Sequence, residues 1–339
     1  MLFRSIVTVN LDGKQTKTEM IDNTAVYRVG SGTLGKLMFP LRAFILASRL
    51  HRKNKYDAFW SVMASYAGFA GLLFSYRHPR IPFILTLQEG DSKEELRVKF
   101  QFVWFLFKRI FSRARHIQVI SKYLAEFALE VRENAPLSII PNGVAVNEFS
   151  MEANSKINEL KRKLEKKEED VFLITTSRLV RKNAVRDIIV ALENLPKNVK
   201  LLIVGDGPLR KQLEDGAHEN GVMDRVIFEG EVSHKQILPY LKVSDIFIRP
   251  SLSEGFGNSF VEAMAAGLPV IATPVGGIVD FLKDKETGLL CNVNDPNSIA
   301  EKVELLLNNS ELKETLSSNA LSMVREKYDW DFISNQYLE

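Results

Sequence analysis

The segment whose residue types and spacing best suit ligand binding covers residues 253–269 and has the sequence SEGFGNSFVEAMAAGLP. Gly255 and Gly257 allow the backbone to turn tightly and to approach a ligand closely. Asn258 or Ser259 is a suitable N-cap for the helix that follows. The unpaired N–H groups and the dipole at such a helix N-terminus both favour an anion. The segment therefore predicts a site for a diphosphate.

Two carboxylates belong to the same segment, Glu254 in the loop and Glu262 in the helix. Because both follow the same strand, they can border one pocket. A structural alternative is equally specific. Ser259-x-x-Glu262 matches a capping box, in which the glutamate only satisfies amides at the start of the helix. The segment by itself leaves both interpretations open.

Two cations follow an earlier strand of the same half of the chain. The strand that ends at Thr176 continues into SRLVRKN, which places Arg178 and Lys182 at the mouth of the neighbouring crevice. Positive groups stabilise a departing diphosphate, and arginine suits bidentate contacts to phosphate. Taken singly, each residue is more typical of a solvated surface charge. Their position beside the glycine loop favours the phosphate interpretation.

The elements that must position these residues are short β-branched runs that alternate with helical patterns, which is typical of parallel βαβ units. In the first half we expect strands at residues 5–10, 24–29, 57–62, 81–87, 116–121 and 137–140. In the second half we expect strands at residues 171–176, 200–204, 225–228, 245–249 and 269–273. Ligands of doubly wound sheets bind at the carboxyl ends of strands near the switch point. The glycine loop and both cations are expected at that point.

The length of the chain indicates more than one domain. At 339 residues it is about twice the usual domain size, so two α/β domains with separate cores are expected. A Lys/Glu-rich run near residues 150–170 is typical of a solvated linker followed by a helix. The predicted division is 1–150, 151–318 and a C-terminal helix at 319–339 that crosses back to the first domain.

Composition narrows the class of protein. The apolar and charged fractions of 45% and 26% are those of a folded soluble protein. The single cysteine, Cys291, excludes an internal disulfide, and the N-terminus shows no signal peptide, which together indicate the cytoplasm. A net charge of +3 is too small to indicate nucleic-acid binding. Residues 58–76 carry no charge, but their Ser, Tyr and Gly content favours a buried strand and helix over a membrane span.

Together these residues resemble glycosyltransferase family 4, the retaining enzymes of the GT-B fold, over most of the chain. The family's Glu-x7-Glu pattern matches Glu254 and Glu262, and its phosphate-binding Arg and Lys match Arg178 and Lys182. Further matches are the glycine turn Gly205-Asp206-Gly207-Pro208, the domain crossing Ile140-Pro141-Asn142-Gly143-Val144 and the closing Tyr328-x-Trp330. The resemblance implies an α/β protein with two doubly wound Rossmann-like domains facing a central cleft.

The resemblance also implies roles for individual residues. Glu254, Arg178 and Lys182 would be catalytic, with Glu254 near the donor sugar. The donor-binding set would be Glu262 on the ribose, Gly255, Phe256, Gly257, Asn258 and Ser259 around the phosphates, and Val232 beside the base. The acceptor side would include Gln88, Glu89 and Asn142.

The chemistry that the resemblance implies needs neither a metal nor a protein nucleophile, since the leaving phosphate itself helps to deprotonate the acceptor. The Asp-x-Asp match at Asp329 and Asp331 is then incidental. No tightly bound cofactor is expected. The expected donor is a UDP- or GDP-sugar, and the expected acceptor is a glycan or a lipid-linked molecule of envelope polysaccharide or glycolipid synthesis.

Three features depart from the family pattern. Family members usually begin with a strand, a glycine-rich loop and a helix, whereas Met1 enters near the second strand, so we expect the first strand-loop-helix unit to be absent. Gln88 stands where the family often has a histidine, and an amide cannot act as a base. The family's Lys-Gly pair is here Lys182-Asn183-Ala184, and we assign Lys182 to the phosphate.

Two other functions compete with this one. The sequence GSGTLG at residues 30–35 fits a dinucleotide fingerprint, which would indicate an NAD-dependent enzyme. Against it, Asp57 begins the next strand instead of ending it, and Pro40 would disrupt the phosphate-binding helix. The other alternative is a non-catalytic partner subunit that keeps the donor-site residues.

The stretch Phe100–Arg115 mixes aromatic and basic side chains on a helical pattern. Such a helix can rest on an anionic membrane, where many members of the family find lipid-linked acceptors. The structural alternative is a core helix whose basic last turn is favoured by the helix dipole. A cytoplasmic protein is therefore expected, and the sequence leaves open whether this stretch makes peripheral contact with the inner face of the membrane or is a core helix.

Overall fold

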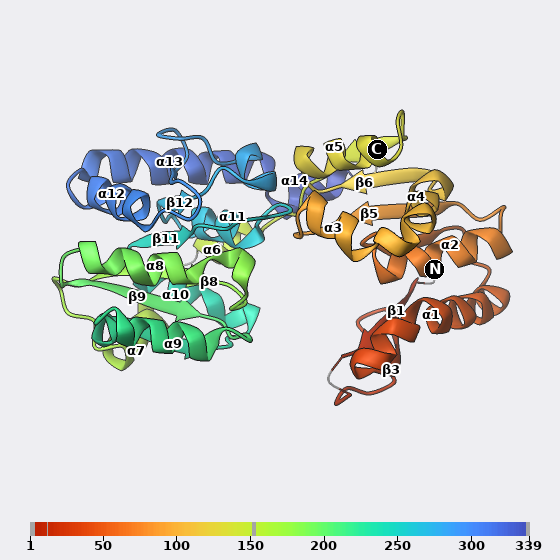
Figure 1. Ribbon diagram of the computed structural model, residues 1–339, viewed down its shortest axis with the longest axis horizontal. Helices are drawn as coiled ribbons and strands as arrows, with labels where there is room; N and C mark the ends of the chain where they lie inside the picture. The colour runs from red at the N-terminus through yellow and green to blue at the C-terminus, as the bar shows by residue number, and fades with distance from the viewer. Residues whose placement is uncertain (1–3, 12, 151–153, 337–339) are drawn as a thin grey trace. The chain divides into compact units, whose positions relative to one another are not determined.

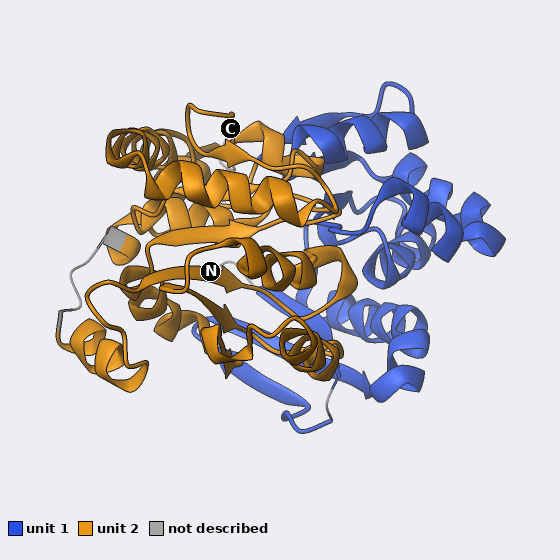
Figure 2. Ribbon diagram, turned by 60° about the vertical axis from the view of Figure 1, so that its left-hand side comes forward, with its two compact units in different colours: residues 1–140 blue, residues 141–339 orange. Residues whose placement is uncertain are grey.

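The computed structural model describes residues 4–11, 13–150 and 154–336 (Figure 1). Contacts between residues divide the chain into two compact units, unit 1 with residues 1–140 and unit 2 with residues 141–339 (Figure 2). Both units contain parallel strands connected by helices, so the expected α/β class is confirmed.

Unit 2 is built on one six-stranded sheet in which all neighbouring strands run parallel. Its strands are β8 (Val171–Thr176), β9 (Val199–Val204), β10 (Val226–Gly230), β11 (Ile246–Arg249), β12 (Val270–Ala272) and β13 (Leu289–Leu290). Their order in the sheet is β10-β9-β8-β11-β12-β13. Counted from β8, this is the 3-2-1-4-5-6 order of the Rossmann sheet. The switch point, where the winding reverses, lies between β8 and β11.

Helices cover both faces of this sheet. On one face lie α8 (Val185–Ala191), α9 (Arg210–Glu219) and α12 (Pro296–Leu307), and the helices α10 (Ile237–Val243) and α11 (Asn258–Ala265) also contact strands. Side chains of a strand alternate between its faces. On β11, Ile248 faces the first helix layer, whereas the ring of Phe247 lies 5.4 Å from that of Phe260 on α11. α11 therefore covers the opposite face.

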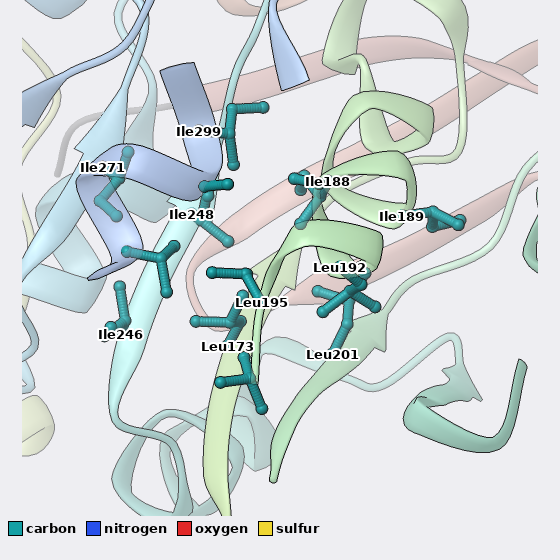
Figure 3. Packing of buried hydrophobic residues seen from close by; sticks show 14 of the residues in the cluster. Leu173, Ile188, Ile189, Leu192, Leu195, Leu201, Ile246, Ile248, Ile271 and Ile299 are labelled. Carbon is teal, nitrogen blue, oxygen red and sulfur yellow. The ribbon is translucent and has the colours of Figure 1, made fainter. Parts of the chain in front are cut away.

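The core between β8, β9, β11 and the first helix layer is made almost entirely of branched aliphatic residues. Figure 3 shows Leu173 and Leu201 of the strands pointing toward Ile188, Ile189 and Leu192 of α8 and its continuation. Buried apolar surface contributes roughly 25 cal/mol per Å² to stability. This packing fixes the strands whose carboxyl ends carry the candidate site.

The remaining elements of unit 2 are helices near its two ends in sequence and short 3-10 helices between its strands. They are α6 (Val146–Ser150), α7 (Asn154–Lys163), α13 (Ser310–Lys327) and α14 (Trp330–Gln336), with the short 3-10 helices η2 (Arg181–Asn183), η3 (Leu192–Asn194), η4 (Met223–Arg225), η5 (His234–Gln236) and η6 (Gly276–Asp280). The predicted Lys/Glu-rich linker contains α7, and its residues 151–153 lie outside the described residues.

Unit 1 contains two sheets. The strands are β1 (Arg4–Asn10), β2 (Thr18–Ile21), β3 (Thr24–Ser31), β4 (Phe59–Val62), β5 (Phe83–Leu87), β6 (His116–Val119) and β7 (Leu137–Ile139). The four strands β4-β5-β6-β7 form a parallel sheet, and β1-β3-β2 form a separate three-stranded sheet. All six strands expected in this half are present, with ends that differ by up to two residues.

Strand β2 was not expected, and it is the one antiparallel member of its sheet. It forms a hairpin with β3 through Asp22 and Asn23, and Asp22 adopts a φ of 50°. Asp and Asn tolerate this left-handed conformation better than other side chains, and two-residue hairpins require it. The Asp-Asn pair between two short runs is thus the signal that predicts this hairpin.

The helices of unit 1 are α1 (Gly32–Asn54), α2 (Tyr66–Arg77), α3 (Lys93–Lys99), η1 (Gln101–Val103), α4 (Trp104–Arg113) and α5 (Lys122–Val131). The uncharged stretch at residues 58–76 forms β4 and most of α2, as expected for a buried strand and helix. Among the described residues, no helix combines the length and the apolar character that a membrane span requires.

The glycine-rich residues 30–35 lie at the junction of β3 and α1. Gly30 and Gly35 approach so closely that a Cβ atom on Gly35 would lie 2.8 Å from the carbonyl carbon of Gly30. Helix α1 continues through Pro40 to Asn54, so the expectation that this proline disrupts a helix here is wrong. Proline lacks one N–H group, and a helix of this length keeps enough other hydrogen bonds and packing to pass through it.

Candidate functional site

The switch point of unit 2 brings two loops into contact. Strands β8 and β11 are neighbours, and Leu173 and Ile174 pair with Ile246 and Phe247. The loop after β8 and the loop after β11 are joined by a hydrogen bond of 2.7 Å from the Leu252 N–H to the Lys182 carbonyl. Chain segments about 70 residues apart thus form one surface, at the place where ligands of doubly wound sheets bind.

The loop after β8 carries the two predicted cations. Arg178 is exposed and Lys182 is half-buried. The buried Asn183 side chain donates a hydrogen bond of 2.7 Å to the Arg178 carbonyl, and Ala184 adopts a φ of 48°. Asn183 therefore shapes the loop, and the cationic side chains of Arg181 and Lys182 come directly before it.

The glycine turn after β9 supports the same loop from the other side. A Cβ atom on Gly205 would lie 2.0 Å from the Ser177 carbonyl oxygen, and one on Gly207 would lie 2.5 Å from the Leu179 carbonyl oxygen. Gly205 also has a φ of +139°, which side chains rarely tolerate. The two glycines are required because the backbone packs directly against the residues that flank Arg178.

The loop after β11 ends in a helix without a side-chain cap. Helix α11 begins at Asn258, and its N-cap is Gly257, with a φ of 100° and no side-chain capping bond. The expectation that Asn258 or Ser259 caps the helix is therefore wrong. The capping box is absent as well, since the Ser259 hydroxyl accepts a hydrogen bond of 2.7 Å from Arg249 and Glu262 contacts another residue. The helix N-terminus keeps the character of an anion site.

Glu254 is held by several contacts. Its Oε2 atom accepts a hydrogen bond of 2.6 Å from Nη2 of Arg249, a buried residue. Its carbonyl accepts a hydrogen bond of 3.1 Å from the Gly277 N–H. A Cβ atom on Gly276 would lie 1.8 Å from the Glu254 carbonyl oxygen, so only glycine fits there. Both the backbone and the carboxylate of Glu254 are thus fixed.

Glu262 faces a histidine that the sequence did not single out. The Oε1 atom of Glu262 lies 2.9 Å from Nε2 of His234, and the His234 ring lies edge-on to Phe149 with centroids 5.9 Å apart. Glu262 has 16% of its side chain exposed, and His234 has 71% exposed. The carboxylate is therefore accessible beside the helix start, and it already accepts a polar contact.

Some of the other predicted donor-site residues are buried, and others are exposed or half-buried. The Phe256 ring is buried against Phe281 and Tyr328, with centroids 5.3 and 5.5 Å apart, so it can offer a ligand only its backbone. Gly255 and Gly257 are buried and Val232 is half-buried. Asn258 is exposed, and its Oδ1 atom accepts a hydrogen bond of 3.1 Å from the Asn142 side chain. Asn142, expected on the acceptor side, thus lies at the start of α11.

Two predicted residues lie in unit 1, just after β5. Gln88 is half-buried, whereas Glu89 is 2% exposed. The carboxylate of Glu89 accepts hydrogen bonds from the Ala64 N–H at 2.5 Å and from the Gln88 N–H at 3.0 Å. Burial raises the pKa of the Glu89 carboxyl to about 7, although these N–H groups favour its ionised form. Glu89 joins the loop after β4 to the loop after β5.

The described residues hold no group of three or more His, Cys, Asp or Glu side chains that could bind a metal ion. In the Asp-x-Asp match, the carboxylate of Asp329 accepts hydrogen bonds from the N–H groups of Val146 and Asp331, at 3.3 and 2.9 Å. Asp329 is therefore engaged by backbone at the starts of α6 and α14.

Two residues of the site escaped the sequence analysis. Arg249 follows the apolar run Ile246-Phe247-Ile248. A charged residue at the end of a buried strand is a pattern that could have indicated a site residue from the sequence. His234 had no such signal, because its contact with Glu262 joins residues 28 positions apart.

Comparison with known families covers nearly the whole chain. The model described as Glycosyltransferase Family 4 matches residues 5–148, and the model described as Glycosyl transferases group 1 matches residues 156–323. The chain belongs to glycosyltransferase family 4. Members of this family are retaining glycosyltransferases that use nucleotide sugars and need no metal. The NAD-dependent alternative finds no support in this membership.

Several curated glycosyltransferases are similar to the chain. An uncharacterized glycosyltransferase, MJ1607 of Methanocaldococcus jannaschii, is 32% identical over 224 residues, which are 64% of this chain and 57% of that protein. The putative teichuronic acid biosynthesis glycosyltransferase TuaC of Bacillus subtilis is 28% identical over 74% of this chain and 61% of that protein. The chain thus spans little more than half the length of these two relatives.

Solved structures of similar fold confirm the GT-B architecture. Sucrose-phosphate synthase of Thermosynechococcus elongatus matches 98% of this chain with a TM-score of 0.86 at 23% identity, over 86% of its own length. Anabaena Alr3699/HepE, solved with UDP and glucose, matches 99% of this chain and 98% of its own length, with a TM-score of 0.81 at 20% identity. This coverage does not support the expectation that the first strand-loop-helix unit is absent.

Proposed function

We propose that this chain is a retaining glycosyltransferase that moves a sugar from a nucleoside diphosphate sugar to a glycan or a lipid-linked acceptor. The observation that carries the proposal is the meeting of two loops at the switch point of unit 2. The loop with Arg178 and Lys182 is hydrogen-bonded to the loop that leads into α11. Cations, an uncapped helix N-terminus and two carboxylates therefore share one surface.

The donor diphosphate would lie between α11 and the loop after β8. The N–H groups of Asn258 and Ser259 point out of a helix whose N-cap makes no side-chain bond. Gly257 allows the backbone to approach the phosphates closely. Arg178 and Lys182 would neutralise the negative charge that develops on the leaving diphosphate, which is a large catalytic term in a preorganised site. Both residues are therefore assigned a catalytic role.

The nucleoside would lie about one turn further along α11, beside Glu262. Glu262 would accept hydrogen bonds from the two ribose hydroxyls, and His234 would move away from it or remain as a neighbour of the ribose. Val232 follows β10 in the next loop of the same edge and would border the base. A UDP-sugar or a GDP-sugar is the preferred donor. The UDP complexes of HepE support a uridine nucleotide in this fold.

The donor sugar would lie beside Glu254, whose position two contacts fix. In the proposed reaction the bond from the anomeric carbon to the phosphate oxygen breaks, and the bond to the acceptor oxygen forms on the same face. The acceptor proton passes to the leaving phosphate. No protein nucleophile is needed, and the role of Glu254 is to orient the sugar and stabilise the charge that develops on it.

The acceptor would be bound by residues of unit 1. Gln88 can offer an amide to a sugar hydroxyl, and Glu89 would act indirectly by holding the two loops that it joins. Relatives named for teichuronic acid, capsular polysaccharide and phosphatidylinositol monomannoside support an acceptor of envelope polysaccharide or glycolipid synthesis.

A peripheral membrane position would agree with such an acceptor. In the stretch Phe100–Arg115, Phe107 and Phe111 are buried in the core, whereas Phe102 is 90% exposed and Phe105 is 65% exposed. The nearby side chains of Lys108 and Arg109 are exposed as well. Exposed aromatic and basic groups on one stretch favour an anionic bilayer surface. We place the protein in the cytoplasm, against the inner face of the membrane.

Liposome flotation tests the membrane contact. Vesicles with anionic lipid should capture the protein, and vesicles of neutral lipid should not. Replacing Phe102 and Phe105 with serine should reduce capture several-fold, while Val98→Ser, which changes another exposed apolar side chain of unit 1, should not. Equal recovery with both lipids would contradict the proposal.

A thermal-shift panel of UDP, GDP, ADP, TDP and NAD, each with EDTA and again with magnesium, tests the donor site. A ligand that binds only the folded state adds about 2.7 kcal/mol of stability at a hundredfold excess over its dissociation constant. A shift by UDP or GDP that persists in EDTA is expected. Glu262→Gln should weaken it, whereas Glu219→Gln, an exposed carboxylate on α9, should not. A shift by NAD alone would refute the proposed function.

Turnover separates an enzyme from a non-catalytic partner subunit. Glu254→Gln should retain binding of the nucleoside diphosphate and lose turnover by roughly 100-fold, the usual effect of removing one group that stabilises a transition state. Nucleotide binding by the unsubstituted chain without any release of nucleoside diphosphate from its sugar would favour the partner-subunit alternative.

A further inference from the structure

Arg249 places a positive charge in the interior of unit 2. The residue is 6% exposed and ends β11, directly beside the switch point. The three strand residues before it are buried and apolar. A guanidinium in such surroundings is strongly unfavourable unless its charge is paired with a carboxylate and hydrogen-bonded. Its contacts therefore show what the charge is used for.

The guanidinium of Arg249 ties together the segments that meet at the switch point. Its Nη1 atom donates to the Ser259 hydroxyl at 2.7 Å and to the Thr176 carbonyl at 3.3 Å. Its Nη2 atom donates to Oε2 of Glu254 at 2.6 Å, and its plane lies 4.4 Å from the centroid of the Phe260 ring. The Nε atom is buried and finds no hydrogen-bond partner in the described part of the chain. Nη1 and Nη2 thus carry all the hydrogen bonds of this side chain.

Glycines pack against the backbone and the Cγ atom of Glu254. The Gly277 N–H holds its carbonyl at 3.1 Å, and a Cβ atom on Gly257 would lie 3.3 Å from its Cγ atom. With the backbone held by Gly276 and Gly277 and Oε2 held by Arg249, the carboxylate has one orientation. Among the described residues no hydrogen bond to its second oxygen, Oε1, is found, so Oε1 is the atom that can face a ligand.

We propose that Arg249 is a positioning residue for the donor sugar, which acts by fixing Glu254 so that Oε1 alone receives a sugar hydroxyl. The inference rests on the proposed function, because it assigns a role to the same carboxylate. The hydrogen bond of Arg249 to the Ser259 hydroxyl attaches the guanidinium to the first turn of α11, whose backbone N–H groups, and not this hydroxyl, would bind the phosphates. A displacement of about 1 Å at a reacting centre lowers a rate by as much as 100-fold.

A purely structural ion pair would behave differently. If Arg249 only balanced a buried charge, its replacement would lower the stability of unit 2 and would affect binding of nucleoside diphosphate and sugar alike. If it positions Glu254, replacement should leave the nucleoside diphosphate site intact and affect the sugar. Comparing the change in nucleoside diphosphate affinity with the change in kcat therefore separates the two alternatives.

The experiment uses the full chain with Arg249→Lys, Arg249→Met, Glu254→Gln and the double variant of Arg249→Met and Glu254→Gln. Arg225→Lys serves as the matched control, because Arg225 is also buried in unit 2 but donates to carbonyls of residues 192, 195 and 196 away from the site. The dissociation constants of UDP and GDP are measured by calorimetry. The release of UDP from UDP-glucose and of GDP from GDP-mannose to water gives kcat and KM without an acceptor.

For the nucleotide that the unsubstituted chain binds, we expect its diphosphate to bind both Arg249 variants within about threefold of the original dissociation constant. We expect kcat to fall by about 10-fold for Arg249→Lys and by about 100-fold for Arg249→Met. The double variant should be no slower than Glu254→Gln, because residues that act as one unit are not additive. Arg225→Lys should keep kcat.

Three results would overturn the inference. One is a kcat within threefold of the original in both Arg249 variants, and another is an equal loss in Arg225→Lys. The third is a loss of nucleoside diphosphate affinity as large as the loss of kcat. If Arg249→Met does not fold, Arg249→Lys carries the same test. Failure of the unsubstituted chain to bind either nucleotide would instead refute the proposed function, and the inference with it.

Discussion

The buried carboxyl of Glu89 makes the stability of unit 1 depend on pH in an unusual direction. Burial raises the pKa of Glu89 to about 7 from its ordinary value of 4.5. The folded state therefore holds this proton more tightly than the unfolded chain does. Most stabilising carboxylates in proteins have lowered pKa values and favour folding at neutral pH. Glu89 does the opposite, and replacing it with glutamine isolates its contribution.

The size of the effect follows from the pKa values. Below pH 4.5 the carboxyl is protonated in both states, and its contribution to stability is fully present. As the pH rises toward 7, the unfolded chain releases its proton first, so the free energy of unfolding falls. Each pH unit corresponds to 1.36 kcal/mol, and the interval from 4.5 to about 7 gives a loss of about 3 kcal/mol. Above pH 7 the loss should level off.

Glutamine cannot titrate, so the Glu89→Gln variant should lack this slope. It also has one carbonyl oxygen in place of two carboxyl oxygens, and it should lose one of the hydrogen bonds from Ala64 and Gln88. The loss of one such bond costs about 1 kcal/mol at every pH. The original should therefore be more stable than the variant by about 1 kcal/mol below pH 4.5. The difference should change sign near pH 5, and above pH 7 the variant should be the more stable protein by about 2 kcal/mol.

Urea unfolding at pH values from 5 to 8, followed by tryptophan fluorescence, measures this difference. The chain has three tryptophans, and Trp330→Phe removes the one in unit 2, so the signal then reports Trp60 and Trp104 of unit 1. Both the original and Glu89→Gln would carry this change. Glu133→Gln, which alters an exposed carboxylate of unit 1, is the control.

Parallel stability curves for the original and Glu89→Gln, with a difference that stays constant to within about 0.5 kcal/mol from pH 5 to pH 8, would refute the reasoning. The reasoning also requires that the free energy of unfolding of Glu133→Gln and of the original change with pH by the same slope. Other titrating groups of unit 1, such as His78, whose pKa burial lowers, are common to all three proteins and cancel in the comparison.

Three further substitutions have effects that can be worked out from local geometry. Gly205→Ala should lower the free energy of unfolding of unit 2 by roughly 3 kcal/mol, since its Cβ atom would lie 2.0 Å from the Ser177 carbonyl oxygen, and urea unfolding measures the loss. Gly216→Ala, inside α9 with open space around its Cβ position, should instead raise the melting temperature and add about 0.8 kcal/mol. Arg225→Met should cost about 3 kcal/mol in urea unfolding, because it removes charge-assisted hydrogen bonds to buried carbonyls, including that of Leu192 at 2.7 Å.

Most of the fold could be predicted from the sequence, because strands buried on both faces are continuous runs of apolar or β-branched residues. Residues 171–176 are six apolar or β-branched residues in succession, and β8 has these bounds. Short or irregular strands leave no comparable pattern. β13 has only two residues, and β2 has only four, of which three are exposed, so neither was expected.

The sequence also predicted which loops form the candidate site, since functional residues of a doubly wound sheet follow its strands. It did not predict how the side chains pair. Propensity favoured Asn258 or Ser259 as the N-cap, but a backbone φ of 100° at Gly257 moved the helix start by one residue. The contact between Arg249 and Glu254 depends on where a buried side chain can reach, which no local pattern records.

The central position of β8 has a consequence for synthesis of the protein. Leu173 pairs with Leu201 on one side and with Ile246 on the other, so one edge of β8 is completed within 28 residues and the other only after 73. A growing chain that has emerged through β10 holds half a sheet with an open, apolar edge, which is prone to pair with other chains. The ribosome must deliver β11 before unit 2 can close. The interval in which this edge of β8 is exposed is therefore set by the synthesis of the residues between 204 and 246.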